Sequence, residues 1–389
     1  MLLTEDHRAV QDAVRAYVQD RIAPQAAAWD KSRHFPAEEL RGLAALGCYG
    51  IAVPTEWDGA GLDYLALAII IEEIAAGDGA TSTIISVNNC PVCSILMAWA
   101  NDAQKAAWLK PLARGDMLGA FCLTEPHVGS QADGLKTTAV RVNGPGGPGG
   151  PLGPDGEHYV LNGVKQFITS GRSGDVAIVM AVTDKAAGKK GISAFIVPTN
   201  TPGYSVARIE DKLGQHASDT AQILFENCRI PAANRLGDEG QGLKIALSGL
   251  EGGRIGIAAQ SVGMARAAFE AALRYSKERV AFGKPIFEHQ ALQFRLAEMA
   301  TQIEAARQLI HHAASLKDGG VPCLKEAAMA KLFASEMAER VCSEAIQIHG
   351  GYGYVADFSV ERIYRDVRVC QIYEGTSDVQ KILIGRALA

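Results

Sequence analysis

Apolar residues in the first part of the chain recur at helical spacing. Residues 65–76 form a strong apolar helix pattern, and residues 101–112 form an amphipathic one. An earlier apolar face ends before Pro24, a residue that stops helices. The first segment is therefore predicted to be helical. Its earliest apolar face consists of Val10, Val14, Tyr17, Val18 and Ile22.

The middle of the chain instead carries short β-rich runs separated by Gly, Pro, Asn and Asp. This pattern is typical of an antiparallel sandwich or barrel. The Gly- and Pro-rich segment 143–156 has no strict triplet period, which excludes collagen and predicts a long hairpin loop. The β-rich runs are residues 118–123, 137–142, 159–161, 176–182, 193–197 and 222–225.

The helical period returns after about residue 235, over stretches long enough to form a bundle. They cover residues 242–279, 289–317 and 324–349. The predicted fold is therefore a multi-domain α+β protein, with an N-terminal α-helical domain, a middle antiparallel β domain and a C-terminal helical bundle. The expected boundaries are 1–116, 117–232 and 233–389.

Composition narrows the class of protein. The 389 residues are 48% hydrophobic and 21% charged, as in a globular protein, and the net charge of −5 argues against a general polyanion binder. No nucleic-acid motif is present, and the most apolar run, 65–71, is too short to span a membrane. The start resembles no signal or transit peptide. The eight scattered cysteines predict reduced, buried thiols, including the pair Cys90 and Cys93.

A carboxylate near the end of the chain stands in an unusual setting. In the stretch "QIYEGTSDVQ", Glu374 follows an apolar, aromatic pair and precedes the flexible Gly375. Ser377 and Gln380 match a capping box, which predicts that a helix begins just after Ser377. Taken alone, this fragment favours the simpler interpretation of Glu374 as an acid in a surface loop.

Four other stretches combine turn residues with groups that bind ligands. Residues 121–130 and 165–171 end strands in turns rich in hydroxyl and backbone N–H groups. Residues 279–283 place Arg279, suited to a pyrophosphate, beside an aromatic ring, and residues 347–351 close a long helix with two glycines. Each could be purely structural. No dinucleotide-binding glycine fingerprint, P-loop or metal-ligand spacing accompanies them.

Together and in this order, these stretches resemble the acyl-CoA dehydrogenase family over nearly the whole chain. The resemblance implies the same three-domain fold, a homotetramer, FAD as cofactor and electron-transferring flavoprotein as electron acceptor. It also implies the cytoplasm of a bacterium or, as the alternative, the mitochondrial matrix. The motifs that carry it are "FCLTEPHVGS", "DKLGQHASDT" with "LFENCRIP", "RVAFGKPIFEHQ", "QIHGGYGY" and "YEGTSDVQ".

The resemblance also assigns roles to residues. Residues 121–130 and 167–169 would line the flavin, residues 376–378 would complete that site, and Arg279, Gln290 and residues 347–351 would reach FAD in a neighbouring subunit. The cofactor residues implied are Phe121, Leu123, Thr124, Ser130, Phe167, Ile168, Thr169, Arg279, Phe282, Gln290, Gln347, Gly350, Gly351, Thr376, Ser377 and Asp378. The substrate residues implied are Ser130, Glu251, Arg254, Tyr373 and Gly375.

In this reading, Glu374 is the catalytic base for an α,β-dehydrogenation. It would remove the α-proton of the acyl-CoA, the β-hydrogen would pass as hydride to FAD N5, and the product would be the trans-2-enoyl-CoA. Ile372 and Tyr373 would supply a dry wall that raises the pKa of Glu374. Some relatives carry their base at the position of Gly253, and glycine cannot abstract a proton.

The resemblance points to a short acyl chain. Residues 86–96 are similar to the helix that closes the acyl cavity in short-chain members, and residues 251–260 are similar to short-chain and short branched-chain members. A butyryl or 2-methyl-branched acyl-CoA is the expected substrate. Two other readings remain open at this point: an acyl-CoA oxidase that reacts with oxygen, and a non-catalytic CoA-binding scaffold.

Overall fold

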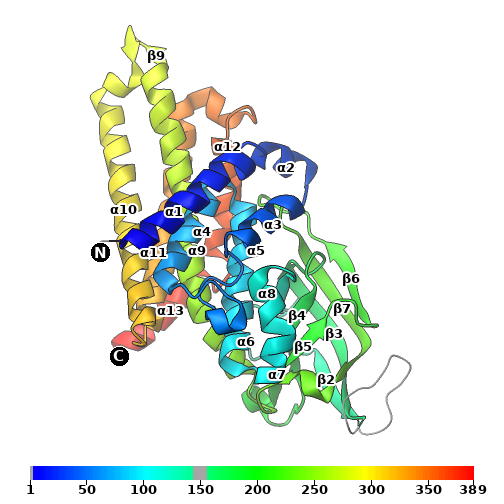
Figure 1. The fold of residues 1–389 in the computed structure, drawn as a ribbon. Helices are drawn as coiled ribbons and strands as arrows, with labels where there is room; N and C mark the ends of the chain where they lie inside the picture. The colour runs from blue at the N-terminus through cyan, green and yellow to red at the C-terminus, as the bar shows by residue number, and fades with distance from the viewer. Residues whose placement is uncertain (1–2, 143–155) are drawn as a thin grey trace.

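The N-terminal part is a set of helices packed beside the bundle (Figure 1). The computed structural model describes residues 3–142 and 156–389, so nearly all of the predicted hairpin loop over 143–156 lies outside the described residues. Helix α4 is almost fully buried and apolar around its circumference except at Glu72 and Glu73, which pair with arginines, and it packs against α1 and α9. The elements are α1 (Glu5–Tyr17), η1 (Val18–Ile22), α2 (Ala26–Ser32), α3 (Ala37–Ala45), η2 (Thr55–Trp57), α4 (Tyr64–Gly77), α5 (Gly79–Val87), η3 (Asn88–Cys93), α6 (Ser94–Trp99), α7 (Asp102–Gln104), η4 (Lys105–Leu109) and α8 (Lys110–Arg114).

The middle part is one eight-stranded sheet. Its strands run in the order β6-β7-β3-β2-β4-β5-β8, and β1 pairs with β4. Most neighbours are antiparallel, as predicted, but β1 runs parallel to β4 and β2 makes one parallel bridge to it. The strands are β1 (Gly119–Cys122), β2 (Thr138–Val142), β3 (His158–Thr169), β4 (Val176–Val182), β5 (Ile192–Pro198), β6 (Tyr204–Ile209), β7 (Thr220–Pro231) and β8 (Arg235–Leu236), with η5 (Gly188–Gly191) and η6 (Ala232–Asn234) between them.

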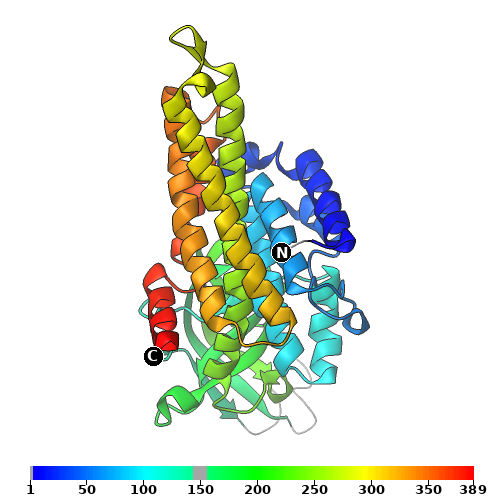
Figure 2. The same ribbon diagram turned by 90° about the vertical axis from the view of Figure 1, so that its left-hand side faces the viewer.

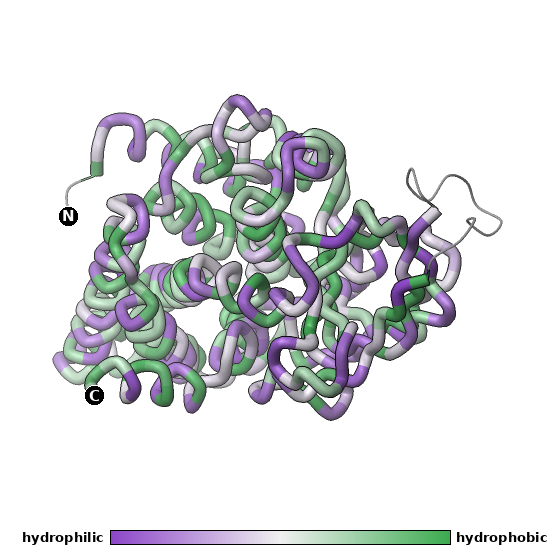
Figure 3. Tube along the Cα trace, turned by 90° about the horizontal axis from the view of Figure 1, so that it is seen from below, coloured by the Kyte–Doolittle hydropathy of each residue, from purple (hydrophilic) through white to green (hydrophobic). Residues whose placement is uncertain are grey.

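The C-terminal part is a helical bundle whose long helices lie side by side (Figure 2). Hydrophobic and hydrophilic residues alternate along these helices, so that each can turn an apolar face inward (Figure 3). A small hairpin joins α9 to α10 at the end of the bundle remote from the sheet. The elements are α9 (Gly242–Glu278), β9 (Val280–Ala281), β10 (Lys284–Pro285), η7 (Ile286–Glu288), α10 (Gln290–Asp318), α11 (Leu324–His349), η8 (Gly350–Tyr354), α12 (Val360–Val367), η9 (Arg368–Gln371) and α13 (Ser377–Leu388).

The predicted order of helices, sheet and helices is confirmed, but the predicted cap of the last helix is wrong. The N-cap of α13 is Thr376, whose side chain accepts a hydrogen bond from the Val379 N–H. The Ser377 hydroxyl is buried without a hydrogen-bond partner. The helix cap therefore lies one residue before the predicted one, and the Gln380 side chain instead hydrogen-bonds to the loop that carries Glu374.

All eight cysteines are free and buried, as predicted. Within the described residues, one helical stretch, Gly79–Trp99, is long and apolar enough to cross a membrane, and 83% of its most apolar window is buried inside the fold. That stretch is accordingly a core segment between the N-terminal helices, the sheet and α9.

Candidate active site

Glu374 lies in a tight loop between η9 and α13. Its φ is +53° and that of Gly375 is +87°, so two successive residues adopt the left-handed conformation. The Gln380 side-chain amide donates to the carbonyl oxygens of Glu374 and Gly375, at 3.0 and 2.8 Å. The Lys331 ammonium donates to the Gly375 carbonyl at 2.8 Å. The backbone that carries the carboxylate is therefore held from two neighbouring helices.

The Glu374 carboxylate points at the glycine face of α9. A Cβ atom on Gly253 would lie 2.8 Å from both Cδ and Oε1 of Glu374, so any side chain at that position would displace the carboxylate. Although the residue as a whole is partly exposed, its Oε2 atom is buried and has no hydrogen-bond partner. Burial raises the pKa of Glu374 to about 7, while the charges of Arg254 and Lys331 oppose that rise. The carboxylate is therefore partly desolvated, as the sequence predicted.

The dry wall around the carboxylate differs from the expected one. Ile372 is 53% exposed and does not form it, because the chain turns that side chain outward at the end of η9. Apolar surface comes instead from across α9, where a Cβ on Gly252 would lie 2.9 Å from Cys90 Sγ and 3.0 Å from Tyr64 Cε1. Small residues on α9 thus bring η3 and α4 close to the site.

Three residues expected to bind substrate have distinct surroundings. Arg254 is 4% exposed, and its Nε and Nη1 atoms have no hydrogen-bond partner. Glu251 accepts a hydrogen bond from Lys317 at 3.0 Å. The Tyr373 hydroxyl is held by Gln260 and Gln215. Only the ring of Tyr373 is therefore left to face a ligand, whereas Arg254 still has unused donors.

The two turns predicted to line a flavin are adjacent. The Gln166 N–H donates to the Thr124 carbonyl at 2.8 Å, which joins residues 121–130 to residues 165–171. Phe167 is 63% exposed at φ +59°, so an aromatic face is presented outward. The Ile168 side chain is buried in the core of the sheet, so only its backbone could contact a flavin. The other residues predicted to line the flavin differ in exposure: Ser130 is exposed, Leu123 is buried, and three are partly buried, namely Phe121, Thr124 and Thr169.

A buried ion pair that sequence analysis missed supports these turns. Lys165 Nζ lies 2.9 Å from Glu125 Oε1 and also donates to the Leu123 carbonyl. Glu125 accepts two further hydrogen bonds, from the N–H groups of Lys136 and Thr137. A fully paired buried acid of this kind fixes a loop in one conformation. Lys165 lies at an inward-facing position of β3. A lysine at such a position was the sequence signal that could have indicated a buried ion pair.

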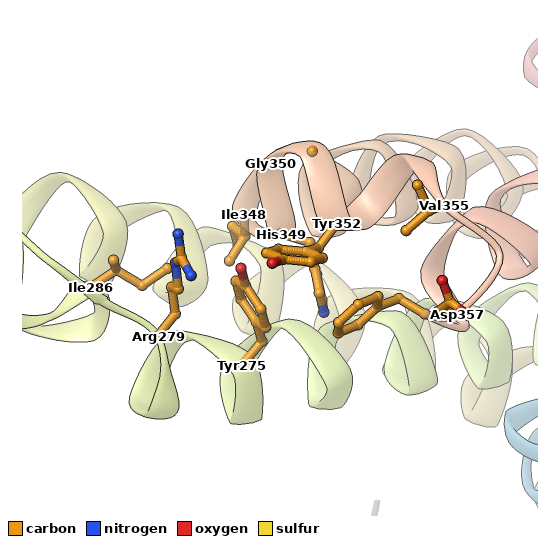
Figure 4. A pocket seen from close by; sticks show the side chains of 11 residues that line it. Tyr275, Arg279, Ile286, Ile348, His349, Gly350, Tyr352, Val355 and Asp357 are labelled. Atoms are coloured by element: carbon orange, nitrogen blue, oxygen red, sulfur yellow. The ribbon is translucent and has the colours of Figure 1, made fainter.

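A separate cavity lies at the remote end of the bundle (Figure 4). Its volume is about 630 Å³, and it brings together Arg279, Gly350 and Gly351, which were predicted to act together. The Arg279 guanidinium lies 5.7 Å from the centre of the Tyr352 ring. Three other residues predicted to contact FAD do not line this cavity: Gln290, Gln347 and Phe282, which is 96% exposed. Thr376 and Ser377 are partly buried and Asp378 is exposed in the first turn of α13.

Family models cover the described domains in turn. The N-terminal, middle and C-terminal domain models of acyl-CoA dehydrogenase match residues 4–116, 120–228 and 240–389. This chain belongs to the acyl-CoA dehydrogenase family. It is accordingly an FAD-dependent oxidoreductase, as the motifs indicated.

Individual relatives agree along the whole length. The human mitochondrial short-chain specific acyl-CoA dehydrogenase is 45% identical over 382 residues, or 98% of this chain and 90% of the relative. The butyryl-CoA dehydrogenase structure from Megasphaera elsdenii has a TM-score of 0.93 and 40% identity, covering 100% and 99% of the two chains. A chain from a structural study of the electron transferring flavoprotein of Acidaminococcus fermentans has a TM-score of 0.94 and 43% identity, covering 100% and 99%.

The residues of this acyl-CoA dehydrogenase family member fit a flavin. An exposed aromatic ring at Phe167, beside hydroxyls and backbone turns, suits a planar heterocycle. An arginine beside two open glycines suits a pyrophosphate, since a Cβ on Gly350 or Gly351 would meet nothing within 4 Å. The first feature belongs to strand β3 of the sheet, and the second lies at the end of the bundle remote from the sheet (Figure 1). Within the described residues, no cluster of His, Cys, Asp and Glu could hold a metal.

Proposed function

We propose that the protein oxidises a short-chain acyl-CoA, straight or 2-methyl-branched, to the trans-2-enoyl-CoA, with Glu374 as the catalytic base. The observation that carries the proposal is the Glu374 carboxylate, whose Oε2 atom is buried without a hydrogen-bond partner and which a pinned loop aims at the glycine face of α9. A carboxylate in such a place costs stability, and groups of this kind cluster at functional sites, which supports a chemical task for Glu374.

The chemistry follows from the loop. Glu374 takes the α-proton, and the electrons left on the α-carbon delocalise onto the thioester oxygen. The Glu374 N–H, which has no acceptor among the described residues, is free to donate to that oxygen as its charge grows. Arg254 offers unbonded donors nearby for the CoA part of the substrate. FAD, when bound, supplies the acceptor for the β-hydrogen.

The preference for a short chain rests on the relatives and on the crowding near Glu374. The relatives described above include a short-chain specific enzyme and a butyryl-CoA dehydrogenase. Tyr64 and Cys90 approach α9 next to Gly253, which supports a shallow acyl cavity. One extra methylene group in such a cavity changes the binding free energy by about 1–3 kcal/mol.

The cofactor site is proposed to need more than one copy of the chain. The exposed Phe167 belongs to strand β3 of the sheet, whereas the cavity beside Arg279 lies at the end of the bundle remote from the sheet, which supports an FAD held between the sheet of one copy and the bundle end of another. A homotetramer and electron-transferring flavoprotein as electron acceptor complete the proposal. A bacterial cytoplasmic location is proposed, with the mitochondrial matrix as the alternative.

Anaerobic mixing with a panel of acyl-CoAs tests the function. Butyryl-CoA and 2-methylbutyryl-CoA are expected to bleach the flavin, and octanoyl-CoA is expected to do so at least about tenfold more slowly. Bleaching that survives brief exposure to air indicates a dehydrogenase. Rapid recolouring with formation of peroxide would instead indicate an oxidase, and no bleaching by any acyl-CoA would contradict the proposal and favour a scaffold.

The activity is also expected to depend on pH in one direction. Because burial raises the pKa of Glu374 to about 7, the base is protonated below that pH and ionised above it. The kcat/KM for butyryl-CoA should therefore rise with pH through about 7 and then level off. Steady-state assays at constant ionic strength would show this, and an acid limb near the usual glutamate pKa would contradict the proposed environment.

A further inference from the structure

Lys331 is a lysine fully buried among alanines. It lies on α11, its exposed fraction is 0%, and Ala327, Ala330 and Ala334 around it are buried as well. Its ammonium makes one hydrogen bond, at 2.8 Å, to the carbonyl of Gly375. Burial lowers the pKa of Lys331 to about 8, so it is still largely charged at neutral pH. A buried cation is costly, and burial with a single neutral partner calls for an explanation.

The charges around Lys331 and Glu374 come from several elements. Arg254 faces both groups from α9, Cys370 faces Lys331 from η9, and Cys90 faces Glu374 from η3. Glu336 faces Lys331 from its own helix. Burial keeps the two thiols neutral. The cations next to the Glu374 carboxylate are thus Arg254 and Lys331, and Lys331 is the one that also touches its loop.

We infer that Lys331 is a positioning residue for Glu374: it fixes the Gly375 carbonyl, and its positive charge favours the ionised form of the base. The inference rests on the proposed function of Glu374. The hydrogen bond holds the second of two left-handed residues, so the carboxylate stays aimed at Gly253. The charge acts through a buried, poorly screened medium, where it has its largest effect.

Gln380 provides a matched control for the two parts of this role. Its amide donates to the same Gly375 carbonyl at 2.8 Å and to the Glu374 carbonyl at 3.0 Å, but it carries no charge. Gln380 is also 0% exposed. Removing Gln380 therefore loosens the loop without changing the local charge, whereas removing Lys331 does both.

The test compares Lys331→Met and Gln380→Met by the pH dependence of kcat/KM for butyryl-CoA. Lys331→Met is expected to move the acid limb up by about one pH unit, the low end of what an opposite charge does across a few ångströms. Gln380→Met is expected to lower the rate while leaving the limb in place. An unshifted limb in Lys331→Met, with wild type active, would overturn the inference.

A second measurement separates this inference from the proposed function. Infrared difference spectra, wild type minus Glu374→Gln, report protonation of the Glu374 carboxyl directly, whether or not any acyl-CoA is oxidised. The same pair in the Lys331→Met background should titrate at higher pH, and an unchanged titration would overturn the inference even for an inactive protein. If Lys331→Met does not fold, Lys331→Gln, which removes the charge but retains a donor, takes its place in both measurements.

Discussion

Replacing Glu374 with glutamine is expected to slow flavin reduction by butyryl-CoA about 10⁴-fold, the upper range for a general base. Glutamine has nearly the same shape, so the loop held by Gln380 and Lys331 should survive, but the amide cannot accept the α-proton. Anaerobic stopped-flow absorbance of the flavin measures the rate. The yellow colour should be retained, because Glu374 is not among the residues proposed to hold FAD.

A matched variant shows whether the loss is specific to the site. Glu56 is an exposed acid in η2 that is not among the residues proposed to bind substrate or flavin. Flavin reduction by butyryl-CoA in Glu56→Gln should therefore proceed at the wild-type rate. If Glu374→Gln were slowed by less than about tenfold, a different group would have to be the base. The flavin content and melting temperature of both variants would show that neither is misfolded.

Replacing Gly253 with alanine is expected to lower kcat/KM for butyryl-CoA at least about 100-fold, the cost of misplacing a catalytic group by about 1 Å. The added methyl would lie 2.8 Å from the Glu374 carboxyl carbon, closer than atoms can pack. Either the carboxylate or its loop must move, and the loop is tied to α11 and α13. Steady-state assays across the pH range would measure the loss.

The control for that variant is another helical glycine. A Cβ on Gly385, in α13, would meet nothing within 4 Å, so Gly385→Ala should keep full activity and gain up to about 1 kcal/mol of helix stability. If Gly253→Ala matched Gly385→Ala in activity, the carboxylate would not depend on the glycine face of α9. Flavin retention by both variants would exclude a general loss of structure.

The helices were the most predictable part of the fold, because apolar periodicity over many turns is a strong signal. Residues 324–349 coincide with α11, and residues 65–76 differ from α4 by one residue at each end. Strand β6 was missed because five of its six residues are exposed, which leaves no alternating apolar pattern. The parallel pairing of β1 with β4 depends on contacts distant in sequence, which local patterns do not encode.

The chemistry of the site was predictable where one short motif holds it. Glu374, Gly375 and their loop are contiguous, so the acid, its flexible neighbour and the following helix could be recognised together. The supports of the loop could not, since Lys331 lies 44 residues from the carbonyl it holds. Gln380 was assigned to a helix cap that Thr376 in fact provides. The outward turn of Ile372 likewise depends on how η9 packs, not on its apolar character.

Proton exchange at the α-carbon tests the central role of Glu374 most directly. Acetyl-CoA has α-hydrogens but no β-carbon, so in deuterated buffer it can exchange protons with a base while nothing leaves as hydride. The wild-type protein is expected to incorporate deuterium into the acetyl group, as mass spectrometry would detect, and Glu374→Gln is expected to incorporate no more than buffer alone. Equal exchange by the two proteins would contradict the assignment of Glu374 as the base.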